Sequence, residues 1–260
     1  MMRQVSICMV IFWLLVSVPS VSPQDTPPPV VVANTEIIDL SSETNGHDYR
    51  LFVALPDSYT ASEQSYPVLY LLDPQISFLA VTEYARFMAY WQELPEIIVV
   101  GIGYPTVDVA ELATLRERDY YISKDEFLGF VSEEVFPLVD STYRTFAADR
   151  AIIGFSYGGE LVFHVLVSQP HLFNRYMAID ASSAEMMPYV MRDDASLREG
   201  FAGRDVRLFM ATTGTEMIAP ALETRAYEGL RVEGLSLGSI THAAALHFSL
   251  PAGISAIYAP

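Results

Sequence analysis

The stretch "RAIIGFSYGGELVFHV", residues 150–165, holds one serine between closely spaced glycines. It begins as a short apolar run typical of a buried strand and continues with the residue spacing of a helix. Ser156 therefore lies at a strand-to-helix junction, where Gly154 and Gly158 complete the pattern G-x-S-x-G. A serine nucleophile in this pattern occupies a sharp, strained turn, and small residues two positions away prevent collisions between the neighbouring elements. The alternative is a glycine-rich turn that happens to contain a serine.

Similar apolar runs recur along the chain and end in small or turn residues: "PVLYLLD", "EIIVVGIG", "YMAIDAS" and "VRLFMATTG". Continuous apolar strands suit a parallel sheet covered on both faces. Helical spacing occupies residues 78–92, 124–139 and 158–168 between them. This alternation predicts a mostly parallel α/β sheet with helices on both faces and sites at the carboxyl ends of its strands.

The first and last strands are predicted at the two ends of this pattern. "TEIIDLSS" and "HDYRLFVALP" are expected to form an antiparallel N-terminal edge, joined by a turn at Asn45 and Gly46. "RVEGLSLG" is expected to form the last strand.

The N-terminus has the pattern of an export signal. Arg3 precedes an apolar run from Val5 to Val18, and small residues follow, so residues 1–22 are predicted to be a secretory signal peptide. The run is short for a membrane span, and an uncleaved anchor is the alternative. Three consecutive prolines indicate that residues 23–34 form an extended linker, and we expect residues 35–260 to form one domain. We expect a secreted or periplasmic protein with no stable membrane span after cleavage.

Composition narrows the classes of function. The chain has 260 residues, 51% of them hydrophobic, and a formal net charge of −17. Such an acidic surface repels phosphate backbones, so no nucleic-acid partner is expected. Cys8, the single cysteine, lies within the signal segment, and we find neither metal-ligand spacing nor a phosphate loop. No metal and no cofactor are predicted.

A serine nucleophile requires a histidine base, usually held by a carboxylate. His47, His164 and His171 occupy positions typical of surface or packing residues. His242 follows the last predicted strand and lies downstream of the candidate acids, in the chain order that α/β-hydrolases use. His247 lies five residues further on, in a predicted helix, and is the weaker alternative.

The acid should follow a strand between the serine and the histidine. Glu216, after "VRLFMATTG", is the first choice; Asp180, after the preceding strand, is the second, and Glu223 is the third. Ordinary surface carboxylates remain the competing interpretation, because the chain has 32 Asp and Glu residues. The backbone amides of Tyr157 and Gln75 are the predicted oxyanion donors. Gln75 is chosen over its neighbour Pro74 because proline has no amide proton.

Several segments together resemble a known family. They are "NGHDYRLFVALPDSY", "YPVLYLLDPQ", "ELPEIIVVGIGYP", "ERDY", "DRAIIGFSYGGELVFHVLVSQPHLFNRYMAID" and "THAAALHFSLPAGISAIY", and they span about residues 35–258. The chain resembles the putative-esterase (esterase-D-like) family of α/β-hydrolases, especially its exported siderophore-esterase-like members. The resemblance implies an α/β-hydrolase fold with Ser156 as nucleophile, His242 as base, Glu216 as acid, and the Tyr157 and Gln75 amides as oxyanion donors.

The sequence also departs from the family pattern. Phe155 stands where relatives often have histidine, and Pro74 replaces a usual glycine. "ERDYYISKDEF" is short for a loop over the site, and "GTEMIAPALETRAYEGLRV" leaves little room for the usual helix before the last strand.

These features predict a serine hydrolase that cleaves carboxylic esters through an acyl-enzyme on Ser156, with a small-molecule ester as its partner. The family resemblance extends this to siderophore-type or aromatic esters. An acyltransferase using the same site and a catalytically decayed binding protein are the alternatives, and the sequence leaves the oligomeric state open.

Overall fold

The computed structural model describes residues 31–182, 186–188, 194–214 and 217–258. The strands are β1 (Thr35–Ser41), β2 (Asp48–Ala54), β3 (Tyr66–Leu72), β4 (Ile98–Gly103), β5 (Thr145–Phe155), β6 (Arg175–Ile179), β7 (Val206–Thr212) and β8 (Leu230–Ser236). The helices are α1 (Pro74–Tyr90), α2 (Val109–Glu117), α3 (Lys124–Phe130), α4 (Phe136–Thr142), α5 (Tyr157–Ser168), α7 (Asp194–Phe201), α8 (Ile218–Arg225) and α9 (His242–Tyr258), with π-helical turns η1 (Arg118–Ile122) and η2 (Val131–Val135). All of these elements belong to the compact unit Asn34–Pro260. The predicted signal peptide and linker residues 23–30 lie outside the described residues.

The strands form one eight-stranded sheet in the order β1-β2-β4-β3-β5-β6-β7-β8. β1 pairs antiparallel with β2, and β2 pairs antiparallel with β4, whereas the pairs from β4 to β8 are parallel. The turn between β1 and β2 contains Gly46 at φ 73°, a conformation that glycine adopts without strain. The structure therefore confirms the α/β-hydrolase fold with an antiparallel N-terminal edge.

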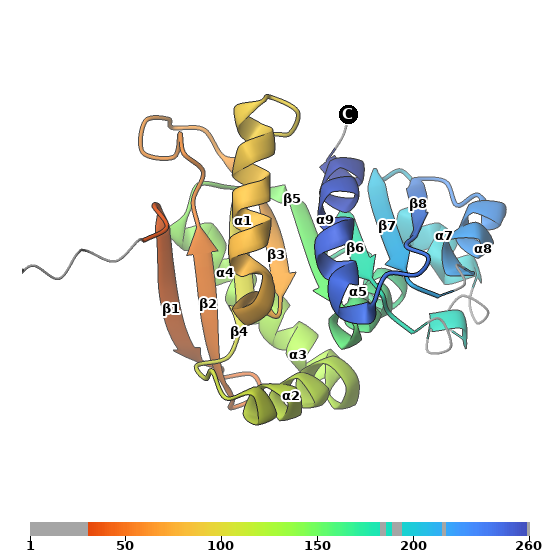
Figure 1. Ribbon diagram of the computed structural model, residues 1–260, viewed down its shortest axis with the longest axis horizontal. Helices are drawn as coiled ribbons and strands as arrows, with labels where there is room; N and C mark the ends of the chain where they lie inside the picture. The colour runs from red at the N-terminus through yellow and green to blue at the C-terminus, as the bar shows by residue number, and fades with distance from the viewer. Residues whose placement is uncertain (1–30, 183–185, 189–193, 215–216, 259–260) are drawn as a thin grey trace, which may run out of the picture. The chain divides into compact units, whose positions relative to one another are not determined.

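Helices cover both faces of the sheet (Figure 1). α1 and α9 pack side by side on one face, where Phe78, Val81 and Ile254 lie in a core with strand residues such as Leu71 and Ile153. α3, α4 and α5 contribute to a second core with the alternate side chains of the same strands, including Tyr70 and Ile152. Burial on both faces explains why these strands are apolar throughout.

The predicted helices form but have different ends. Helix α1 starts four residues before its predicted start, because Pro74 occupies the first turn, where proline fits without losing a hydrogen bond. The region 124–139 becomes α3, η2 and α4 in continuous sequence. The expectation of little room before the last strand was wrong, since α8 fits between β7 and β8.

The carboxyl ends of β3, β5 and β6 lie at the lower end of Figure 1, where α1, α5 and α9 begin.

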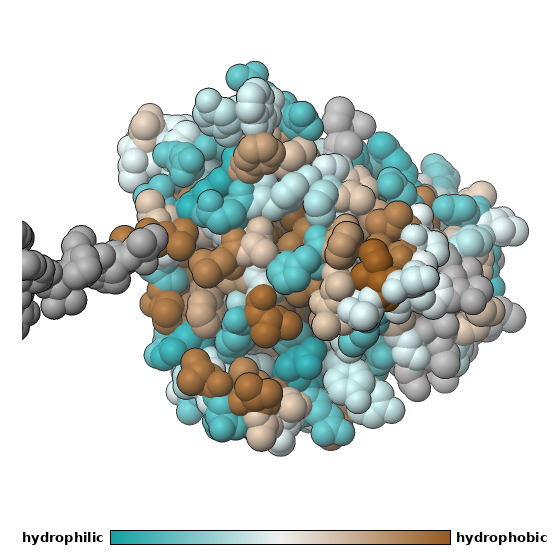
Figure 2. Space-filling view, viewed as in Figure 1, coloured by the Kyte–Doolittle hydropathy of each residue, from teal (hydrophilic) through white to brown (hydrophobic). Residues whose placement is uncertain are grey.

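Figure 2 shows brown, apolar side chains over α1 and near α2, and the exposed apolar residues of these elements include Ile76, Leu79 and Val109. In the described part of the chain, no helix has the length and apolar character needed to cross a membrane.

Candidate active site

Ser156 forms the N-cap of α5, directly after β5, with φ 57° and ψ −122°. A positive φ is costly for any residue with a side chain, and such strain concentrates at functional sites. The turn is fixed on both sides, because the Ser156 amide donates to the Ile179 carbonyl at 2.9 Å and its own carbonyl accepts from Glu160 at 3.0 Å. The junction is therefore the sharp strand-to-helix turn that the sequence predicts.

The two glycines of the pattern are not equally necessary. A Cβ added at Gly154 would lie 2.2 Å from the Gly158 carbonyl oxygen, a distance that no side chain tolerates. A Cβ at Gly158 would lie 3.5 Å from Asp73 and Leu72, which is ordinary van der Waals contact. A Cβ at Gly159 would meet Ile179 at 3.0 Å and Ala181 at 3.1 Å. Close packing thus demands glycine at 154 and favours it at 159, whereas 158 has room for a methyl group.

His242 begins α9, and its ring reaches two residues from neighbouring strands. Its Nδ1 atom lies 2.6 Å from Oδ2 of Asp180, the residue that follows β6. Its imidazole stacks on the Phe155 ring, with centroids 4.6 Å apart and planes at 29°. Because Phe155 directly precedes Ser156, this stacking places the imidazole beside the serine turn. Among the described residues, no hydrogen bond joins the Ser156 hydroxyl to the ring.

Asp180 is held tightly in its place. It has φ 47°, and its side chain is 6% exposed. Oδ1 accepts hydrogen bonds from the Thr213 amide at 2.7 Å and from the Thr213 hydroxyl at 2.9 Å. The Asp180 amide donates to Ala211 at 2.7 Å. β7 and the residue that follows it thus fix the carboxylate that faces His242.

The other candidates have different outcomes. Glu216, the sequence's first choice of acid, lies outside the described residues. Glu223 is exposed on α8 and makes no hydrogen bond to His242. His247 is exposed on the next turn of α9, and Nε2 of His164 lies 3.2 Å from Oδ1 of Asp125 on α3. The carboxylate that the structure brings to His242 is therefore the sequence's second choice, Asp180.

The two predicted oxyanion donors lie in the first turns of helices. Gln75 is the second residue of α1, and Tyr157 is the first of α5. Amides at these positions have no acceptor within their own helix, and the helix dipole favours an anion there. The two helices follow β3 and β5, which are neighbours in the sheet. The arrangement suits two amides that converge on one oxygen.

Pro74 does not disturb this loop, because β4 makes room for its ring. A Cβ at Gly101 would lie 2.4 Å from Pro74, and a Cβ at Gly103 would lie 2.7 Å from both Pro74 and the Gln75 side chain. The Gln75 side-chain amide donates to the Tyr104 carbonyl at 3.0 Å. The glycines of "VVGIGYP" thus provide the space that the proline takes.

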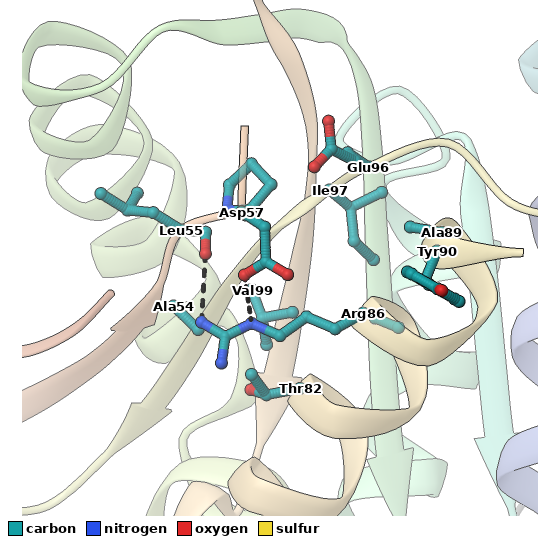
Figure 3. A pocket seen from close by; sticks show the side chains of 12 residues that line it. Ala54, Leu55, Asp57, Thr82, Arg86, Ala89, Tyr90, Glu96, Ile97 and Val99 are labelled. Atoms are coloured by element: carbon teal, nitrogen blue, oxygen red, sulfur yellow. Dashed lines mark hydrogen bonds and ion pairs between the residues drawn. The ribbon is translucent and has the colours of Figure 1, made fainter. Parts of the chain in front are cut away.

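A separate cavity of about 160 Å³ lies far from these residues (Figure 3). It lies between the second half of α1 and the first residues of β4, and none of the candidate site residues lines it. The Arg86 side chain crosses it to the Leu55 carbonyl, at 3.2 Å, and toward Asp57. In a parallel sheet, ligands bind at the carboxyl ends of the strands, so this cavity at the start of β4 is not the expected site for chemistry.

Comparison with known proteins identifies the family and supports the fold. The family model "Putative esterase" matches residues 41–197. The chain belongs to this family. It is 27% identical over 184 residues to the ferri-bacillibactin esterase BesA of Bacillus subtilis, covering 62% of this chain and 63% of that protein. It is 30% identical over 175 residues to a siderophore triacetylfusarinine C esterase of Aspergillus fumigatus, covering 61% of this chain and 59% of that protein.

Solved structures show the same fold. The BES protein of Bacillus cereus superposes with a TM-score of 0.76 over 90% of this chain and 98% of that one, at 19% identity. The curated relatives match this chain over about three-fifths of their own length.

Proposed function

We propose that this esterase-family protein is a serine hydrolase that cleaves carboxylic esters through an acyl-enzyme on Ser156. The observation that carries the proposal is the 2.6 Å contact between His242 and Asp180, beside a strained serine turn. A buried carboxylate at Nδ1 fixes the imidazole tautomer that leaves Nε2 free to accept a proton. That is the arrangement a general base for a serine hydroxyl requires.

In the first half of the reaction, Nε2 of His242 takes the proton of the Ser156 hydroxyl as the oxygen attacks the ester carbonyl. The Tyr157 and Gln75 amides hold the oxyanion of the tetrahedral intermediate. Collapse of the intermediate breaks the bond to the alcohol, which leaves with the proton from His242. Water then attacks the acyl-enzyme by the same route and releases the acid.

Asp180 orients His242 and stabilises its charged form during both halves. The missing Ser156–His242 hydrogen bond is compatible with this role, because such bonds often tighten only when substrate is bound. Phe155 limits the tilt of the imidazole by stacking on it. Contact with substrate is then expected to bring the serine hydroxyl within reach of Nε2.

We further propose that the substrate is a siderophore-type or aromatic ester and that the protein is exported. The curated relatives include a ferri-bacillibactin esterase and a siderophore triacetylfusarinine C esterase. Beside the nucleophile, the Tyr157 ring stacks on the Tyr121 ring with centroids 5.8 Å apart, and the two residues are 41% and 46% exposed. Exposed aromatic faces next to a nucleophile suit a flat acyl group or leaving group. The signal pattern of residues 1–22 supports export.

The test is intact-mass analysis after exposure to a fluorophosphonate, run beside hydrolysis of 4-nitrophenyl esters. The wild type should gain one adduct and release nitrophenol, whereas Ser156→Ala should gain none and lose at least about 10³-fold in kcat. A folded wild type without adduct or turnover would instead support a decayed binding protein. Transfer to an added alcohol in preference to water would identify an acyltransferase.

A further inference from the structure

Asp73 is a buried carboxylate that the proposed reaction does not use. It directly follows β3 and forms the N-cap of α1, with φ 55° and ψ 50°. An N-cap aspartate normally accepts a hydrogen bond from its own helix, but the Asp73 side chain does not. Its carbonyl instead holds the first turn, accepting from the Ile76 amide at 3.1 Å and the Ser77 hydroxyl at 3.2 Å.

The Asp73 carboxylate is committed to Arg116 of α2. Nε and Nη2 of Arg116 donate to Oδ1 and Oδ2 at 2.6 Å and 2.9 Å, and the two side chains are 24% and 5% exposed. A two-pronged pair of this kind fixes direction as well as distance. Arg116 thus ties the start of α1 to α2, a helix that contacts η1 and α5.

Two buried tyrosines, Tyr104 and Tyr120, interact electrostatically with the Asp73–Arg116 pair. Burial raises the pKa of Asp73, and the Arg116 guanidinium counteracts that rise. Burial also raises the pKa of Tyr120 on η1 and of Tyr104 after β4 far above the ordinary value, and the Asp73 charge contributes to both. Arg116 is therefore the cation that compensates the Asp73 charge, and the phenols facing it stay neutral.

The location of this pair connects it to the chemistry. Asp73 lies two residues before Gln75, whose amide is one proposed oxyanion donor. Asp73 also lies near the second proposed donor, Tyr157. A Cβ added at Gly158, the residue after Tyr157, would lie 3.5 Å from Oδ2 of Asp73. A negative charge thus lies near the segments that carry both proposed donor amides, which must stabilise another negative charge.

We propose that Arg116 is a positioning residue of the oxyanion hole. It fixes the Asp73 turn that presents the Gln75 amide, and it neutralises the carboxylate that lies near both donors. This inference rests on the proposed function. Without Arg116, the turn loses its anchor, and an ionised Asp73 repels the developing oxyanion. Both effects act in the transition state more than in substrate binding.

The experiment compares Arg116→Met with Arg118→Met, with Ser156→Ala as the inactive reference. Arg118 is a matched control, because its side chain is also 24% exposed and also forms a two-pronged pair with a buried aspartate, Asp119, at 2.6 and 2.8 Å. We expect Arg116→Met to lower kcat for a 4-nitrophenyl ester by about 10- to 100-fold with KM changed by less than about 3-fold. Arg118→Met should lose a comparable amount of stability while kcat stays within about 2-fold of wild type.

The pH dependence of kcat/KM distinguishes a positioning role of Arg116 from a general disturbance of the folded structure. In Arg116→Met, kcat/KM should fall as pH rises through the pKa of Asp73, because the uncompensated carboxylate then ionises. The double variant Arg116→Met/Asp73→Asn should lack that decline and recover part of the lost kcat. Arg116→Lys, which keeps the charge but not the two-pronged geometry, should lie between wild type and Arg116→Met and serves if the methionine variant does not fold.

Unchanged kcat and pH profile in folded Arg116→Met, while Ser156→Ala is inactive, would overturn the inference and leave the proposed function intact. Equal losses of kcat in the Arg116 and Arg118 variants would also overturn it. A wild type with neither adduct nor turnover would overturn both proposals together.

Discussion

Asp73, Ser156 and Asp180 share one backbone feature: each has a positive φ, 55°, 57° and 47°, although none is glycine. Each directly follows one of three adjacent strands, β3, β5 and β6. A non-glycine residue in such a conformation costs about 1–3 kcal/mol and persists only where its surroundings impose it. Hydrogen bonds impose it at Ser156 and Asp180, and the Arg116 pair imposes it at Asp73. The strain at these three residues therefore lies at the carboxyl ends of adjacent strands, where the proposed chemistry takes place. Asn34, Gln92 and Ala226 also have a positive φ but follow none of these strands.

Replacing each candidate acid in turn identifies the one that serves His242. We expect Asp180→Asn to lower kcat by about 10³- to 10⁴-fold, because an amide at Nδ1 favours the wrong tautomer of the base. Glu216→Gln should stay within about 10-fold of wild type. The measurement is kcat on a 4-nitrophenyl ester, with circular dichroism to confirm folding. The reverse ranking of the two variants would restore Glu216 as the acid.

At the scale of elements, one carboxylate ties the β1–β2 turn to the helices on one face. Glu134 of η2 accepts hydrogen bonds from the Ser42 hydroxyl at 2.7 Å, the Thr44 amide at 2.7 Å and the Glu43 amide at 3.1 Å. Burial raises the pKa of Glu134, but the hydrogen bonds from Thr44, Ser42 and Glu43 outweigh it and leave the pKa below its ordinary value of 4.5. Its ionised form is therefore stabilised by folding.

Because the folded-state pKa of Glu134 is lowered, its contribution to stability is present above the unfolded-state pKa and is lost as pH falls through the folded-state value. We expect Glu134→Gln to lower the free energy of unfolding by about 1 kcal/mol at pH 7, with the difference from wild type shrinking toward pH 3. Urea unfolding at both pH values measures it. Glu133→Gln, an exposed neighbour on the same turn, is the control and should change little. A difference that grows in acid would contradict this role.

Element types follow well from local patterns, whereas contacts between elements do not. Apolar runs predict the central strands, mixed or alternating segments predict the edge strands, and the G-x-S-x-G pattern predicts the serine turn at Ser156 without any long-range information. The partner of His242 depends instead on the register of β6 and β7, which places Asp180 against Thr213 and the start of α9. No local pattern separates Asp180 from Glu216, since both follow an apolar strand. The Asp73–Arg116 pair spans 43 positions and likewise needs the fold to be seen.

At the scale of the whole molecule, charge is the dominant property. The chain carries 32 acidic and 15 basic residues, Lys plus Arg, and its net charge of −17 is distributed over many elements. Such a field extends over about 30 Å at 10 mM salt and over about 3 Å at 1 M. At low ionic strength it repels an approaching anion before any contact with the site forms, and a neutral molecule does not experience this barrier.

We therefore expect salt to discriminate between two matched esters, 4-acetoxybenzoate and its neutral methyl ester. Between 10 mM and 1 M NaCl, kcat/KM for the anionic ester should rise by about 3- to 10-fold, because screening removes the repulsion during encounter. The neutral ester should change by less than about 2-fold, which controls for salt effects on the chemical step. The measurement is the initial rate at substrate concentrations well below KM, at fixed pH. A decline for the anionic ester would show that cations near the serine turn, such as Lys124 over the Tyr121 ring at 5.2 Å, outweigh the field of the whole molecule.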